Sequence, residues 1–107
     1  MRLKDISGNL RKLVGSVMQS PLERERGLYQ RCRKLSKQIE ETPDNITLYV
    51  LHGELNLERG KHERARTDFE TAIELAERAD ESRGWLVMEQ IMRDRALHGL
   101  RRMERQL

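Results

Sequence analysis

The side chains best suited to catalysis or metal binding are scattered along this chain of 107 residues. His52, His62 and His98 lack the spacing that would bring metal ligands together on one helix face, and Cys32 is the only cysteine. There is no glycine-rich phosphate loop, no nucleophile elbow and no paired-cysteine motif. We therefore expect a protein that is not an enzyme, with no catalytic residues, no cofactor and no bound metal.

The composition is rich in charge and poor in aromatic side chains. Charged and apolar residues each make up 36% of the chain, and aromatic residues only 4%. The acidic residues alternate with Lys and Arg at helical spacing, which is typical of a helix surface with many ion pairs. This composition indicates long amphipathic helices with solvated outer faces, or a core that a partner completes.

Charge is unevenly distributed along the sequence. Residues 1–40 carry ten Lys/Arg against four Asp/Glu, whereas residues 41–82 carry five against eleven. Solvated helix faces explain this pattern most simply. The alternatives are a basic surface that touches nucleic-acid phosphates, and a membrane surface bound by the basic, amphipathic first segment. Both alternatives are less favoured than a protein partner, because few aromatic side chains are present to stack on bases and the first segment has no Trp or Phe on its apolar face. The residues of the candidate basic surface are Arg26, Arg33, Lys34 and Lys37.

Prolines, glycines and capping residues divide the chain into five predicted helices within one helical domain, residues 1–107. The helices cover about 1–20, 21–41, 46–59, 62–78 and 85–104. Ser20-Pro21 is a helix-start signal, and Gly60 is placed to close the third helix. No segment alternates with a period of two, so we expect an all-α fold without strands. The domain comprises basic N-terminal helices over 1–41, a hairpin over 43–78 and a C-terminal helix over 82–106.

Apolar residues at helical spacing predict which faces are buried. The second helix has one such stripe, in which Cys32 is interpreted as a small core residue. The fourth helix has another, dominated by small side chains around one large ring. The two stripes are Leu28, Cys32, Leu35 and Ile39, and Ala65, Phe69, Ala72, Ile73 and Ala76.

The stretch from Pro43 to about Glu77 resembles a tetratricopeptide repeat, a helix–turn–helix unit of about 34 residues. The resemblance rests on a large aromatic, a glycine four residues later, and a small–large–small pattern on the second helix: Tyr49, Gly53, Ala65, Phe69 and Ala72. Three positions depart from the family pattern. His52 replaces the usual leucine, Asn56 the usual aromatic, and Glu77 the closing proline. One repeat cannot bury both its faces, so flanking helices are expected to cover it.

The resemblance implies a protein–protein interaction module, such as an adaptor, scaffold or chaperone-like protein. In this family the first helix of each repeat lines a concave groove. The corresponding groove positions are Thr47, Val50, Glu54, Leu57 and Glu58. Because two of these are carboxylates, we expect a partner protein or peptide of basic or mixed apolar-basic character rather than a C-terminal carboxylate.

The start of the fifth helix is apolar on more than one side. Trp85, Met92, Ala96, Leu100 and Met103 form one stripe that can cover the hairpin. Val87, Met88 and Ile91 project away from that stripe and predict a second contact, either in a homodimer or with a partner. The alternative is that the first helix of the same chain covers them.

The sequence also bears on the compartment. A single cysteine excludes an internal disulfide, no apolar run approaches the length of a membrane span, and no continuous apolar segment follows the basic N-terminus. We therefore expect a cytoplasmic protein.

Overall fold

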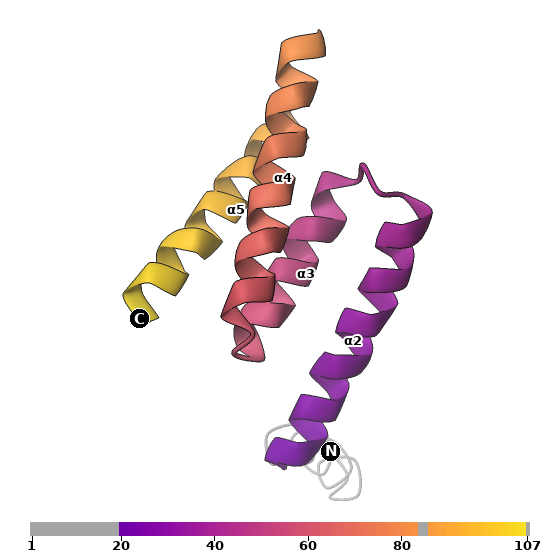
Figure 1. Ribbon diagram of the computed structural model, residues 1–107, viewed down its shortest axis with the longest axis vertical. Helices are drawn as coiled ribbons and strands as arrows, with labels where there is room; N and C mark the ends of the chain where they lie inside the picture. Colours follow the sequence, from indigo (N-terminus) through magenta and orange to yellow (C-terminus); the bar gives the residue numbers. More distant parts are fainter. Residues whose placement is uncertain (1–19, 84–85, 107) are drawn as a thin grey trace, which may run out of the picture.

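A computed structural model describes residues 20–83 and 86–106 of the chain (Figure 1). These residues form four helices and no strand, and consecutive helices run in alternating directions. The helices are α2 (Pro21–Glu41), α3 (Ile46–Glu58), α4 (His62–Arg83) and α5 (Val87–Gln106). The all-α fold is confirmed for this part of the chain. The predicted first helix and Trp85 lie outside the described residues.

The predicted helix starts have the expected caps. The Ser20 hydroxyl accepts a hydrogen bond from the Glu23 amide at 3.1 Å, and the Glu23 carboxylate accepts one from the Ser20 amide at 3.4 Å. This reciprocal pair satisfies two amide groups that α2 itself leaves free. Asn45 caps α3 through one bond, in which its side-chain oxygen accepts from the Leu48 amide at 3.4 Å.

Gly60 ends α3 and permits the sharp turn into α4. Its φ is +75°, a backbone conformation that residues with a Cβ adopt at a cost. The Gly60 amide donates to the Leu57 carbonyl, and the Lys61 amide donates to the Asn56 carbonyl at 2.8 Å. These two bonds form a Schellman motif, which allows α3 and α4 to pack as an antiparallel hairpin.

The structure corrects two predicted helix ends. α4 continues to Arg83 rather than ending near Arg78, and α5 begins at Val87 rather than at Trp85 or earlier. The segment from Ala79 to Arg83 contains neither glycine nor proline. Without the closing proline of the repeat family, nothing in the backbone prevents α4 from continuing.

The core lies where α3, α4 and α5 pack against one another. The predicted stripe of α4 is buried, with Ile73 at its edge, and the predicted stripe of α5 covers it through Met92, Ala96, Leu100 and Met103. α2 packs against α3 alone among the described helices and contributes its own buried pair, Leu28 and Cys32. No helix in the described part of the chain is long and apolar enough to cross a bilayer.

Phe69 occupies the centre of this core and has no exposed surface. Gly53 of α3 and Gly99 of α5 both face its ring. A Cβ added to Gly53 would lie 2.7 Å from the Phe69 Cε1 atom, and one added to Gly99 would overlap the ring further. The predicted hairpin places Gly53 near Ala65 or Phe69, and the ring of Phe69 is the neighbour found, whereas the sequence indicated no role for Gly99. Two glycines therefore allow α3 and α5 to approach the same aromatic ring.

Gly53→Ala and Gly99→Ala should each lower the free energy of unfolding by about 1–3 kcal/mol, because the enclosed ring cannot move away from a new methyl group. This loss opposes the gain of about 1 kcal/mol that Ala normally gives inside a helix. Gly27 is the matched control, because nothing lies within 4 Å of a Cβ placed there. Gly27→Ala should be neutral or stabilising in chemical denaturation. A destabilisation shared equally by all three variants would contradict this packing.

Candidate functional site

Two cavities flank the interface between α2 and α3. The larger has a volume of about 430 Å³, and we call it the leucine groove. Its floor is made by half-buried leucines from both helices, and charged side chains form its rims. The lining residues are Arg31, Lys34, Leu35 and Gln38 of α2, and Leu51, Glu54, Leu55 and Glu58 of α3.

The rims of the leucine groove carry opposite charges. Arg31 and Lys34 lie on the α2 side, and Glu54 and Glu58 on the α3 side. Arg95 of α5 donates two hydrogen bonds to the Glu54 carboxylate, from Nε at 2.8 Å and from a terminal nitrogen at 2.6 Å. Hydrogen bonding to Glu54 raises the pKa of Arg95. Partial burial lowers this pKa, but by less, so the pKa stays raised. Glu58 is exposed, so its carboxylate is the acidic group available to a ligand.

The structure corrects part of the predicted groove. Val50 and Leu57 are buried, because α5 packs onto the face of α3 that was expected to be open. Thr47 is half-buried and does not line the leucine groove. Glu54 and Glu58 do line it, together with Leu51 and Leu55, which the sequence prediction missed. The apolar wall is thus formed by the neighbouring face of the same helix.

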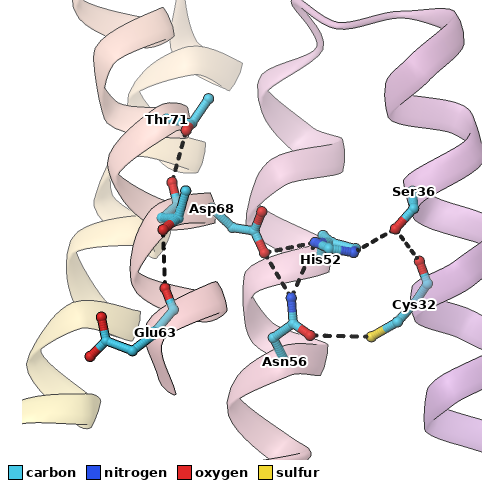
Figure 2. Close-up of polar contacts among 8 residues, drawn as sticks. Cys32, Ser36, His52, Asn56, Glu63, Asp68 and Thr71 are labelled. Atoms are coloured by element: carbon cyan, nitrogen blue, oxygen red, sulfur yellow. Dashed lines mark hydrogen bonds and ion pairs between the residues drawn. The ribbon is translucent and has the colours of Figure 1, made fainter. Parts of the chain in front are cut away.

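The other flank of α2 and α3 contains a polar cluster, which we define as Cys32, Ser36, His52, Asn56 and Asp68 (Figure 2). His52 Nδ1 lies 2.7 Å from Asp68 Oδ2, and His52 Nε2 lies 2.9 Å from Ser36 Oγ. Asn56 donates from Nδ2 to the same Asp68 oxygen at 2.9 Å. The Cys32 thiol lies 3.8 Å from Asn56 Oδ1, a weak contact. The cluster joins α2, α3 and α4.

The hydrogen-bond partners assign the protons of the cluster. An ionised Asp68 can only accept, so His52 Nδ1 and Asn56 Nδ2 are both donors to it. The short contact of 3.2 Å between Asn56 Nδ2 and His52 Nδ1 then joins two donors and is not a hydrogen bond. The single proton of the Ser36 hydroxyl is shared between two acceptors, His52 Nε2 at 2.9 Å and the Cys32 carbonyl at 3.0 Å.

The order hydroxyl, imidazole, carboxylate is also the connectivity that activates the nucleophile of serine hydrolases. Two features distinguish the arrangement here. Ser36 Oγ also lies 3.0 Å from the Cys32 carbonyl, the local bond of a serine inside a helix. Ser36 lies in the interior of α2, where backbone amides are used within the helix and cannot form an oxyanion hole. The geometry therefore favours a clamp between helices.

Two members of the cluster are positions where the sequence departs from the repeat pattern. His52 and Asn56 stand where a leucine and an aromatic are usual, and both turn toward α2 and α4. The sequence offered no direct signal for the cluster, because Ser36, His52 and Asp68 are each separated by 16 residues. The signal that could have found it is a pair of polar residues, four apart, on an otherwise apolar helix.

The smaller cavity lies over the polar cluster and has a volume of about 240 Å³. We call it the arginine cavity, because three arginines from three helices line it. Its lining residues are Tyr29, Cys32, Arg33 and Ser36 of α2, His52 and Asn56 of α3, Arg59 at the C-cap of α3, and Arg64 of α4. None of them is a carboxylate.

Arg59 is fixed in the wall of the arginine cavity. Its Nε donates to Glu25 at 3.1 Å, its guanidinium lies 5.3 Å from the centre of the Tyr29 ring, and its side chain is only 9% exposed. Burial lowers the pKa of Arg59, but the interactions with Glu25 and Cys32 together more than offset this and leave the pKa raised. Arg59 therefore keeps its charge in the partly desolvated wall.

The candidate basic surface is divided by the packing of α2. Arg26, Arg33, Lys34 and Lys37 are all exposed. Lys34 belongs to the rim of the leucine groove, whereas Arg33 lines the arginine cavity on the opposite flank. Two of the four residues thus border different cavities, and Arg26 and Lys37 line neither.

The start of α5 exposes large apolar side chains. Val87, Met88 and Ile91 are 73%, 59% and 49% exposed. Leu86 is 50% exposed and extends the same region. We call these four residues the α5 patch.

Asp68→Ala should lower the free energy of unfolding by about 1–3 kcal/mol, because it leaves the buried donors of His52 and Asn56 without an acceptor. The matched control is Asp94→Ala on α5, whose side chain is 76% exposed. That variant should stay within about 0.5 kcal/mol of the wild type. Equal stabilities of the two variants in urea unfolding would show that the polar cluster does not hold the helices together.

No group of three or more His, Cys, Asp or Glu side chains in the described part of the chain is arranged to hold a metal ion. Comparisons with protein-family models, with curated proteins and with solved structures gave no match to this chain. The function is therefore inferred from the chain's own residues.

Proposed function

We propose that this chain is a protein-interaction module that binds a peptide segment of a partner in the leucine groove. The observation that carries the proposal is the floor of Leu35, Leu51 and Leu55, which stays half-buried between two charged rims. A groove of about 430 Å³ with an apolar floor is of the size and character that ligand sites have. Its length along two helices suits an extended or helical peptide.

The proposal includes the resemblance of the α3–α4 hairpin to a tetratricopeptide repeat. The close contact between Gly53 and Phe69, and the burial of Ala65 and Ala72, support it. α5 packs on both helices of the hairpin, as the first helix of a following repeat would. In such an arrangement α3 contributes to a ligand groove, and here α2 supplies the opposite wall.

The charges of the groove specify the ligand. A mixed apolar-basic segment suits it best, with apolar side chains on the leucine floor and a basic side chain beside Glu58. Glu54 is already paired with Arg95 and contributes less. A uniformly basic segment would be repelled by Arg31 and Lys34 on the other rim.

The α5 patch supports a second contact, in a homodimer of this chain. Leu86, Val87, Met88 and Ile91 are neighbours at the start of one helix, and each is about half exposed or more. A continuous group of large exposed apolar side chains marks an interaction surface more often than isolated ones do. Two copies of the patch around a twofold axis would cover each other.

Glu58→Lys should weaken binding of the groove ligand by about twofold to fivefold, because it replaces an exposed ion pair worth up to about 1 kcal/mol with a repulsion. Peptides selected from a displayed library on the wild type provide the probe, and fluorescence anisotropy measures their affinities. Glu104→Lys makes the same charge change on an exposed site of α5 and is the control. Tighter binding by Glu58→Lys would show that the groove prefers an acidic ligand.

Val87→Glu combined with Ile91→Glu should convert a wild-type dimer into a folded monomer, because two charges on the α5 patch disfavour its burial. Light scattering at micromolar concentration measures the mass, and circular dichroism measures the helix content. Leu22→Glu is the control, because Leu22 is 72% exposed on α2. A wild-type monomer would end the dimer proposal.

A further inference from the structure

The arginine cavity collects positive charge from three helices with no acidic side chain in its lining. Arg59 is neutralised by Glu25, and His52 faces Asp68. Arg33 and Arg64 are exposed and form no ion pair within the described part of the chain. Two uncompensated guanidinium groups beside one cavity repel each other, and an anion placed between them would remove that repulsion.

The chemistry of the lining favours a tetrahedral anion. Guanidinium groups present fixed forks of N–H donors that match phosphate and carboxylate oxygens. Here Arg33 comes from α2, Arg59 from the C-cap of α3 and Arg64 from α4, so three arginines border one cavity. The peripheral oxygens of a phosphate group can accept from three directions at once, whereas a carboxylate has two oxygens in one plane. The Ser36 hydroxyl adds a further polar group to the lining, and the Tyr29 ring adds an apolar one.

The size of the cavity limits what carries the phosphate. A volume of about 240 Å³ is smaller than that of most small-molecule sites, which begin near 300 Å³. It has room for a phosphate group and a short stem, but not for a base and a sugar as well. The remainder of the ligand would therefore lie outside the cavity, along the exposed surface of α2.

We propose that the arginine cavity binds the phosphate group of a phosphorylated peptide, with Arg33 and Arg64 as its principal ligands and Arg59 as a fixed third donor. The inference rests on the proposed interaction function and adds a second site to it. The leucine groove lies on the opposite flank of the α2–α3 interface, so the two sites recognise separate segments of a partner or separate partners.

The test is a titration of the full chain, followed by NMR of backbone amides and arginine Nε–H groups. The probes are inorganic phosphate, a short alanine-rich peptide with a central phosphoserine, and the same peptide without the phosphate. Phosphate and the phosphopeptide should give saturable shifts at Arg33, Arg59 and Arg64, and the unphosphorylated peptide should not. Added NaCl should weaken both interactions, since the contacts are charged and partly exposed.

Arg33→Gln with Arg64→Gln should weaken phosphopeptide binding by about tenfold or more, equivalent to about 1.4 kcal/mol. Both side chains are exposed, so the fold should be retained, which circular dichroism checks. The matched control is Arg31→Gln with Lys34→Gln, which removes the same charge from α2 on the leucine-groove side. The control should bind the phosphopeptide like the wild type.

Several outcomes would overturn the inference. These are the absence of saturable binding, equal binding by the two double variants, equal binding of the unphosphorylated peptide, and preference for a single-stranded oligonucleotide over the phosphopeptide. Failure here is distinguishable from failure of the leucine groove, because Glu58→Lys changes groove binding and leaves the arginine cavity intact.

Discussion

The Phe69 ring and the two glycines that face it determine the distances between α3, α4 and α5. Any side chain at Gly53 or Gly99 would push a helix away from the ring. Because both glycines allow close approach, α5 reaches α3 as well as α4, and Val50 and Leu57 become core residues. Close packing of this kind gains dispersion contacts that no single polar interaction on the surface matches. The arrangement of the remaining structure follows from this three-helix contact.

α2 is held by interactions of another kind. Its apolar contribution is small, with Leu28 and Cys32 as its buried residues, and the polar cluster supplies hydrogen bonds that link Ser36, His52 and Asp68. Apolar contacts tolerate sliding, whereas a buried donor without its acceptor costs about 1–3 kcal/mol, so the cluster favours one register of α2 on α3. Since α2 touches α3 alone among the described helices, both flanks of the interface stay open.

The two flanks differ because adjacent faces of α2 carry different residues. One flank has a leucine floor with rims of opposite charge, and the other has a polar floor with arginines around it. The first suits burial of apolar side chains, which supplies affinity, and the second suits a charged group, which supplies specificity. A module with both surfaces, and with exposed apolar residues at the start of α5, would join segments of different chemistry.

Interactions between residues close in the sequence determined the helices of this protein, their caps and their apolar faces. The Ser20 cap, the Gly60 turn, and the apolar stripes of α2, α4 and α5 follow from propensities and a period of 3.6 residues, which act over a few neighbours. The end of α4 was mispredicted, because a weak local break competed with a continuous run of helix formers. Only the tertiary structure decided which face of α3 stays open, because that depends on where α5 packs. It also brought together Ser36, His52 and Asp68, and the three arginines, since side chains from separate helices meet only once the helices have fixed positions and registers.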